Sequence, residues 1–111
     1  MEYRASHRYA PITARKARLV VDRVRGKHVD DALQILRATP KRASYFVDKV
    51  LRSALANADQ SLVAEMEELR VARAWVDEGP SRRRIRPISR GRAHVITSRT
   101  SHINIVLDDG Q

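Results

Sequence analysis

The N-terminal residues alternate in character in the way that predicts a β-strand. From Glu2 to Ala10, every second side chain is apolar or aromatic and falls on one face: Tyr3, Ala5, His7 and Tyr9. Charged or hydroxyl side chains occupy the other face. Pro11 removes a backbone donor and ends the pattern, so residues 2–10 are expected to form a strand.

Two helical patterns follow this strand. The first is expected to begin after Thr13, whose hydroxyl can cap a helix, and to run to about Arg25, with Gly26 as its stop. Its apolar residues share one face at helical spacing: Ala17, Val20, Val21 and Val24. A shorter helix is expected next, with Asp30 and Asp31 in its first turn, where carboxylates suit the positive helix end.

A third and longest helix is expected to open at Thr39-Pro40, with the proline in the first helical position. Its apolar residues match the i, i+3, i+4 spacing of a core helix: Ala43, Phe46, Val47, Val50, Leu51, Ala54 and Ala58. The next stretch, residues 58–69, fits either a loop or one or two further helical turns.

Two further strands are predicted in the second half of the chain, at Leu69–Asp77 and Arg99–Leu107. The second directs Ile103, Ile105 and Leu107 to one face. The expected fold class is therefore α+β, with three helices packed on a small antiparallel sheet of about three strands and a long extended β-hairpin.

That hairpin is expected at residues 79–97, within a single domain whose globular body comprises residues 1–78 and 98–111. Gly79-Pro80 lets the chain leave the sheet, and Pro87 and Gly91 bracket a turn-forming stretch. Each arm of about ten residues would project roughly 30 Å.

The expected turn at Ile88–Ser89 also predicts a register. Folding back there would place Gly79 near Ser98 and Trp75 near His102, so that sheet and hairpin form one continued ribbon. An isolated two-stranded ribbon is marginal in water, so another molecule is expected to order it.

Charge is concentrated towards the two ends of the chain. The 22 Lys and Arg outnumber the 13 Asp and Glu, which gives a net charge of +9. Residues 1–27 carry eight Lys and Arg against two acids, residues 28–78 seven against nine, and residues 79–111 seven against two. Two basic blocks around a near-neutral middle predict a docking face for a polyanion, either nucleic acid or an anionic membrane.

The stretch GPSRRRIRPISRGRAH, residues 79–94, holds six arginines and no carboxylate. Unpaired guanidinium groups repel one another unless a polyanion supplies the missing charge. A solvated or disordered basic segment is the plain alternative, which the strand expected after it disfavours. Membrane binding would need more apolar residues than this arm offers: Ile85, Ile88, Val95 and Ile96.

RNA is favoured over DNA as the polyanion. The sequence contains no helix-turn-helix, Cys/His-finger or basic-heptad pattern of the kind that reads duplex DNA. Folded RNA is recognised by shape and phosphate, and it offers clefts that an extended arm can thread.

An enzyme is the competing class, and the sequence supports it weakly. The four histidines lie in different segments without metal-binding spacing: His7, His28, His94 and His102. A basic ribonuclease could use His94 or His102 as acid and base, but this is the weakest alternative. The chain has no cysteine, which excludes disulfides and thiolate metal sites, and no metal or cofactor is expected.

Aromatic residues leave two alternatives open. Trp75 is expected in the core rather than as a base-stacking platform, while Tyr3 and Tyr9 fit either sheet packing or stacking on RNA. The N-terminal residues lack an apolar signal segment, and no run approaches membrane length, which predicts a soluble, cytoplasmic protein without membrane insertion.

Three stretches closely resemble the bacterial type of the large-subunit ribosomal protein twenty-two family. They are ITARKARLVVDRVRG (residues 12–26), VLRSALANA (residues 50–58) and VDEGPSRRRIRPISRGRAHVITSRTSHINIVL (residues 76–107). The most specific features are DEGP at Asp77–Pro80 and the Gly91-Arg92 pair, which nine residues separate from His102-Ile103. Ile88 departs from the pattern, since many relatives have a basic residue there.

The resemblance implies a structural constituent of the large ribosomal subunit. Such proteins place a globular body near the exit of the nascent-peptide tunnel, bind several domains of the large-subunit ribosomal RNA, and support its assembly. Their hairpin threads into the RNA and its tip lines the tunnel, where changes affect macrolide susceptibility and the response to stalling peptides. The implied partners are ribosomal RNA, neighbouring large-subunit proteins and the nascent peptide, with no homo-oligomer expected.

The resemblance and the charge pattern together nominate site residues. The expected RNA contacts are Arg15, Lys16, Arg18, Arg82, Arg83, Arg84, Arg86, Arg90, Arg92 and Arg99. The expected tunnel-lining tip is Arg86, Pro87, Ile88, Ser89, Arg90 and Gly91.

Overall fold

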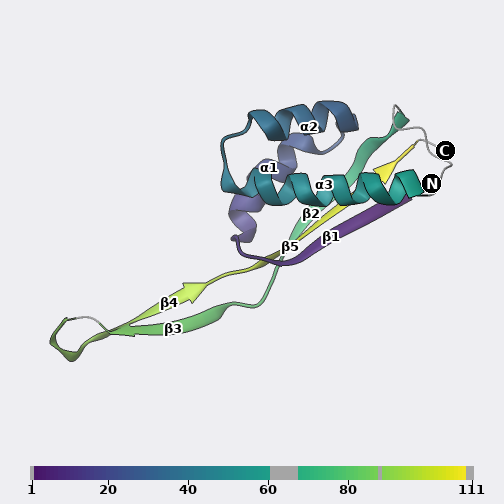
Figure 1. The fold of residues 1–111 in the computed structure, drawn as a ribbon. Helices are drawn as coiled ribbons and strands as arrows, with labels where there is room; N and C mark the ends of the chain where they lie inside the picture. The colour runs from purple at the N-terminus through teal and green to yellow at the C-terminus, as the bar shows by residue number, and fades with distance from the viewer. Residues whose placement is uncertain (1, 61–67, 88, 110–111) are drawn as a thin grey trace.

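Three helices cover one face of a three-stranded antiparallel sheet, and a two-stranded hairpin extends from one end of that sheet (Figure 1). The computed structural model describes residues 2–60, 68–87 and 89–109. The elements in chain order are β1 (Glu2–Ala10), α1 (Ala14–Val24), α2 (Val29–Ala38), α3 (Arg42–Gln60), β2 (Arg70–Glu78), β3 (Arg82–Pro87), a short 3-10 turn (Ser89–Gly91), β4 (Ala93–Ser98) and β5 (Ser101–Asp108). The α+β prediction is confirmed.

The ends of the first two helices have clear local causes. Thr13 caps α1 by accepting a hydrogen bond from the backbone N–H of Lys16 at 3.4 Å, and Gly26 follows the helix in the left-handed conformation, with φ of 78°. His28 caps α2, where Nδ1 accepts from the backbone N–H of Asp30 at 3.3 Å.

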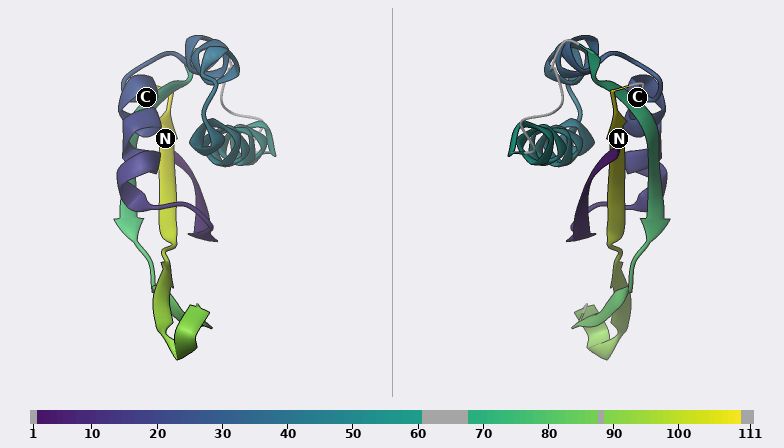
Figure 2. Two further views of the ribbon diagram at one scale, coloured as in Figure 1. Left: turned by 90° about the vertical axis from the view of Figure 1, so that its left-hand side faces the viewer. Right: turned by 90° about the vertical axis from the view of Figure 1, so that its right-hand side faces the viewer.

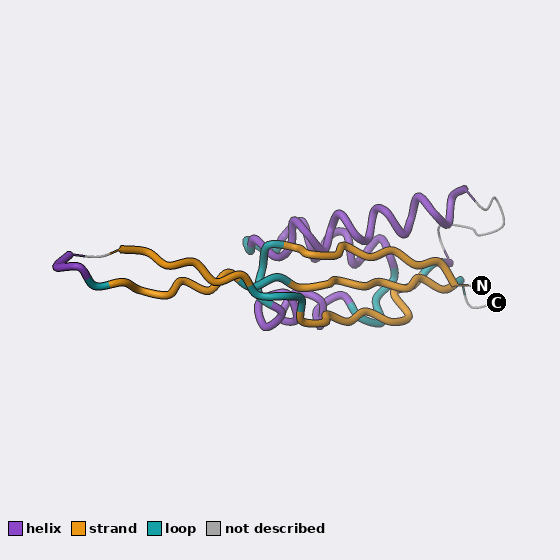
Figure 3. Tube along the Cα trace, turned by 90° about the horizontal axis from the view of Figure 1, so that it is seen from below, coloured by secondary structure: helices purple, strands orange, loops and turns teal. Residues whose placement is uncertain are grey.

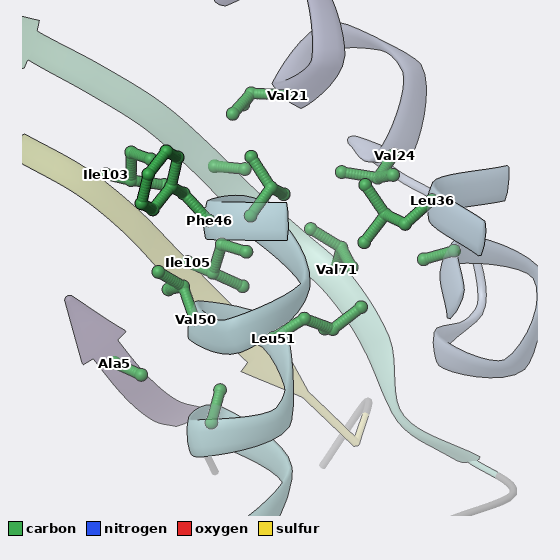
Figure 4. Packing of buried hydrophobic residues seen from close by; sticks show 14 of the residues in the cluster. Ala5, Val21, Val24, Leu36, Phe46, Val50, Leu51, Val71, Ile103 and Ile105 are labelled. Carbon is green, nitrogen blue, oxygen red and sulfur yellow. The ribbon is translucent and has the colours of Figure 1, made fainter. Parts of the chain in front are cut away.

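The helices bury their apolar faces against the sheet in a single core (Figure 4). All of the predicted core positions of α1 and α3 are buried, and Ile103, Ile105 and Leu107 of the central strand β5 are fully inaccessible. β1 packs mainly under α3 and β2 mainly under α1. Within the described ranges, no helix is both long enough and apolar enough to cross a membrane.

The start of α3 differs from the expectation. Pro40 is not in its first turn, because α3 begins at Arg42. The hydroxyl of Thr39 donates to the carbonyl of Ile35 at 2.7 Å, so this residue still belongs to the end of α2. A residue before proline also avoids the helical region, and Thr39 is extended at φ −91° and ψ 111°. Helix α3 then continues through Gln60, so residues 58–60 are helical, while residues 61–67 lie outside the described ranges.

Two β-bulges overturn the expected facing of the aromatic residues. One lies between His7 and Ala10 of β1, so Tyr9 leaves the inward face and Ala10 takes its place. The other lies between Val71 and Arg73 of β2. It reverses the alternation, so that Ala74 and Val76 face the helices and Trp75 faces outward, 37% exposed, rather than in the core. Tyr3, by contrast, is buried in the sheet packing.

The hairpin is also paired differently from the prediction. Arg82 lies opposite Ser98 and Pro87 opposite Ala93, while Trp75 pairs with Asn104 rather than with His102. The chain folds back at residues 89–91 rather than 88–89. Two sheets form instead of one continued ribbon, because strand pairing stops after Glu78 and Ser101 and resumes at Arg82 and Ser98. At this junction a single backbone hydrogen bond, from the N–H of Gly79 to the carbonyl of Thr100 at 2.9 Å, joins the two segments.

The hairpin makes the molecule elongated (Figures 2 and 3). The radius of gyration is 17.1 Å, where a compact chain of this length would have about 13 Å. The longest extent is 63 Å and the other two are 25 and 17 Å. The hairpin tip therefore lies far from the core that stabilises the body.

Candidate RNA-binding surface

The pairing of β3 with β4 gives the hairpin two chemically different faces. Directly opposed residues of an antiparallel pair share a face, and faces alternate along each strand. One face therefore carries Arg82, Arg84 and Arg86, with Ser98, Ile96 and His94 opposite them. The other face carries Arg83, Ile85 and Pro87, with Thr97, Val95 and Ala93 opposite them. Three arginines thus form a row at every second residue.

The turn of the hairpin depends on left-handed backbone. Arg90 has φ of 66° and Gly91 has φ of 71°, and this pair turns the chain from β3 into β4. A Cβ at Gly91 would meet nothing within 4 Å, so backbone conformation rather than crowding favours glycine there. The turn presents the exposed side chain of Arg90 at the far end of the molecule, next to Gly91 and Arg92. Ile88, predicted at the tip, lies outside the described residues.

In the described part of the chain, the arginines of the hairpin have no acidic partners. Within the described ranges, no ion pair or side-chain hydrogen bond involves Arg82, Arg83, Arg84, Arg86, Arg90, Arg92 or Arg99. Arginines of the body differ: Arg73 lies 2.8 Å from Glu2, Arg25 2.8 Å from Asp22, and Arg52 2.9 Å from Asp48. Every described residue of β3 and β4 is exposed, so the unpaired charges face solvent.

At the base of the hairpin, four of the predicted arginines line one hollow of about 390 Å³. We call it the basic hollow. Its lining comes from the start of α1 and from both strand junctions: Thr13, Ala14, Arg15, Arg18, Glu78, Gly79, Ser81, Arg83, Thr97, Arg99 and Thr100. Glu78 is the one acid among these lining residues. The positive end of the α1 dipole adds to the same field. Arg15 and Arg99, which are 84 positions apart in the sequence, thereby line the same hollow.

A second hollow, of about 440 Å³, adjoins the first across Thr13, Arg99 and Thr100. Among the predicted RNA-binding residues, Lys16 and Arg99 line it, and so does Arg42, which was not predicted from the sequence. Arg42 is the first residue of α3, and its guanidinium carbon lies 5.6 Å from the centre of the Phe46 ring. Only the fold shows that the start of α3 lies beside the hairpin base, so no local sequence signal could have nominated it.

Arg18 has a structural contact of its own. Its Nε and Nη2 groups donate to the carbonyl oxygen of Val76 at 3.2 and 3.0 Å, which ties α1 to β2. Arg25 bonds in the same way to the carbonyl of Ala74, at 3.0 and 2.8 Å. The charge of Arg18 still faces the basic hollow, but its position is fixed by the body, unlike that of Arg15 or Arg83.

The arrangement suits phosphate binding rather than catalysis. His94 lies on β4 in the hairpin sheet and His102 on β5 in the body sheet, eight positions apart along mostly extended chain, about 25 Å at full extension, which does not suit an acid–base pair. In the described part of the chain, no group of three His, Asp or Glu could hold a metal ion. Guanidinium groups, in contrast, bind phosphate oxygens through two parallel hydrogen bonds.

A small α+β body with a projecting hairpin, whose described arginines have no acidic partners, defines a class of protein. It is a structural protein whose excess positive charge is neutralised by a polyanion. The chain belongs to the ribosomal protein L22p/L17e family, whose sequence profile matches residues 5–108. It is 53% identical over 107 residues to the large ribosomal subunit protein uL22 of Carboxydothermus hydrogenoformans, covering 96% of this chain and 95% of that protein.

These matches confirm the family resemblance. The chain is a structural constituent of the large ribosomal subunit, a component of the cytoplasmic ribosome, and not an enzyme. Its partners therefore include ribosomal RNA and other ribosomal proteins.

Proposed function

We propose that this chain holds segments of the large-subunit ribosomal RNA together through its hairpin and the hairpin base, and so supports subunit assembly. The observation that carries the proposal is the row of unpaired arginines on a ribbon that projects from a folded body. The RNA-binding residues are Arg15, Lys16, Arg18, Arg82, Arg83, Arg84, Arg86, Arg90, Arg92 and Arg99, and Arg42 joins them.

Two physical features support this role. The hairpin lacks a core of its own, so phosphates that neutralise its arginines would also order it. Its two faces both carry arginine at the base, since Arg83 points opposite to Arg82 and Arg84. Such a ribbon can contact RNA on both sides and fix the distance between the two segments.

The proposal extends to the tip. Arg86–Gly91 would line the nascent-peptide tunnel and contact the growing chain, as the family resemblance implies. The position of the turn at the far end of a 63 Å molecule supports this, because the body could remain outside while the tip reaches inward.

Incorporation into subunits tests the RNA-binding part. Changing Arg83, Arg84 and Arg92 to glutamine should weaken incorporation into large subunits and leave the thermal midpoint of the free protein unchanged or raised. The matched control changes Arg23, Lys27 and Arg37, which are exposed on the body, and removes the same charge. Equal loss in both triple variants would reduce the effect to net charge and contradict the proposal.

A crosslinker placed at Arg90 in assembled subunits tests the tip. It should capture a stalled nascent peptide, whereas the same crosslinker at Arg23 should not. Capture from neither position would contradict the tunnel assignment and leave RNA binding intact. A nuclease activity lost in His94→Ala, with incorporation preserved, would instead favour an enzyme.

A further inference from the structure

The sheet face that the helices leave uncovered carries aromatic side chains beside the hairpin. Helices α1, α2 and α3 all pack on the face that holds Ile103, Ile105 and Leu107. The opposite face holds the alternate residues of β5, including His102 and Asn104, with Trp75 of β2 next to Asn104. We call Tyr9, Trp75 and His102 the aromatic patch.

Tyr9 is held out from the body by a strained backbone. Its φ is 59°, a conformation that costs a bulky residue about 1–2 kcal/mol and tends to persist only where surrounding contacts impose it. Its N–H donates to Nδ1 of His102 at 3.0 Å, and its ring meets the His102 ring edge to face at 5.0 Å. The ring nevertheless remains 60% exposed. The bulge thus fixes a flat aromatic surface in solvent.

His102 connects this surface to the basic hollow. Because Nδ1 accepts from Tyr9, the hydrogen of the neutral ring is on Nε2, which is then a donor. A Cβ at Gly79 would lie 3.3 Å from Cε1 of His102, so this ring borders the residue that lines the basic hollow. The aromatic patch therefore begins where the arginine-lined surface ends.

Trp75 completes the patch from the other edge strand. It is the diagonal neighbour of His102 across the β2–β5 pair, two residues along β2 from Asp77, which lies directly opposite His102. Strand β5, which carries His102, lies between β1 and β2, so Tyr9 on β1 and Trp75 on β2 flank His102. Neighbouring strands are about 4.8 Å apart, so β1 and β2 are separated by about 10 Å.

We infer that the aromatic patch stacks on unpaired nucleobases of RNA whose phosphates lie along the basic hollow. The core of a protein–protein interface is mostly apolar. Here the exposed large aliphatic residues of the described chain lie elsewhere, on α1 (Leu19) and on the hairpin (Ile85, Val95 and Ile96). Exposed aromatic rings beside an arginine-lined hollow fit single-stranded RNA, whose bases would stack on the rings while its phosphates meet the arginines.

This inference rests on the proposed RNA binding and adds its base-contacting site. Trp75 is the one tryptophan of the chain, so its fluorescence reports on the patch directly. The full protein is titrated with a single-stranded oligoadenylate of about ten nucleotides, within the usual site sizes, and with an RNA duplex of equal length. Both should bind through the arginines, but only the single strand should quench Trp75.

Two tyrosine variants give the matched comparison. Tyr9 and Tyr45 are almost equally exposed, at 60% and 59%, but Tyr45 lies on α3, away from the patch. Tyr9→Leu should weaken oligoadenylate binding about 5- to 100-fold, in line with the loss of one stacked base, and Tyr45→Leu should leave it unchanged. Because the fluorescence titration uses the unaltered protein, folding of the variants does not limit the test.

Several results would overturn the inference. Salt-dependent binding of both RNAs without quenching, with equal affinity of the two tyrosine variants, would leave the proposed function standing and remove the stacking site. A shift of Trp75 emission to shorter wavelength on adding isolated large-subunit proteins, with no response to RNA, would assign this face to a protein partner. If neither RNA binds at any salt concentration, the proposed function fails as well.

Discussion

The body and the hairpin use arginine in opposite ways. In the body, Arg25 donates to the carbonyl of Ala74 and pairs with Asp22, and Arg73 pairs with Glu2, so their charges are tied into the fold. In the hairpin, the described arginines have neither carbonyl nor carboxylate partners, and every described residue of both strands is exposed. The body arginines stabilise the fold, whereas the hairpin arginines are available to bind a ligand.

This difference shows that the folding free energy of the body and that of the hairpin have different sources. Burial of one apolar cluster stabilises the body without any partner. The described residues of the hairpin gain almost nothing from burial and their charges repel one another, so we propose that RNA orders the hairpin.

Amide hydrogen exchange should separate the two regions most strongly. In the free protein, the central amides of β5 should exchange at least about a thousandfold more slowly than those of β3 and β4, because the core amides open only with the whole body. Measurement residue by residue checks this. Equal protection in the hairpin and in β5 would break the comparison.

The same substitution, isoleucine to alanine, should have different effects on the free energy of unfolding in the body and in the hairpin. Ile105→Ala removes a fully buried side chain from the central strand and should lower the free energy of unfolding by about 2–5 kcal/mol. Ile85→Ala removes the same atoms from a side chain that is 75% exposed, and should change it by less than about 0.5 kcal/mol. Chemical denaturation of both variants measures the difference, and similar losses would show that the hairpin has a core.

Gly79, at the junction, should behave as part of the body. A Cβ there would clash with the hydroxyl of Thr100 and approach its carbonyl carbon to 3.2 Å, so Gly79→Ala should cost about 1–3 kcal/mol. Gly91→Ala strains only the hairpin turn, where the added methyl meets open space, and should leave the unfolding of the body unchanged. Thermal and chemical denaturation of the two variants compare them directly.

The two kinds of arginine should respond in opposite assays. Arg25→Gln loses the paired hydrogen bonds to Ala74 and should lower the free energy of unfolding by about 1–2 kcal/mol with little change in RNA affinity. Arg84→Gln should leave stability unchanged and weaken RNA binding. Denaturation and filter binding of the same two variants measure both effects. Loss of stability in Arg84→Gln together with loss of RNA binding in Arg25→Gln would contradict the account.

The sequence predicted regular elements well, since their patterns were long and consistent. The nine-residue strand β1 and the buried face of α3 follow directly from alternation and from the i, i+3, i+4 spacing. The errors came from single irregular residues. A bulge before Ala10 and another after Val71 reverse the facing of Tyr9 and Trp75, and alternation alone contains no signal for either.

The site was predicted in composition but not in geometry. Arg83 and Arg99 stand out in the sequence, yet their convergence with Arg15 in the basic hollow depends on the antiparallel return of β5 beside β2. The register shifted by two to three residues because the turn is built around left-handed Arg90 and Gly91, and arginine is an uncommon residue in that conformation.

Salt dependence of RNA binding tests the central claim, that the hairpin arginines neutralise phosphates, most directly. With six phosphates neutralised by the hairpin, the logarithm of the affinity for a ribosomal RNA fragment should fall with the logarithm of salt concentration with a slope of about −4 to −5. Changing Arg83, Arg84 and Arg92 to glutamine should make the slope less steep by about one for each residue. A slope near −1 for the unaltered protein, or one that the triple variant leaves unchanged, would contradict the account.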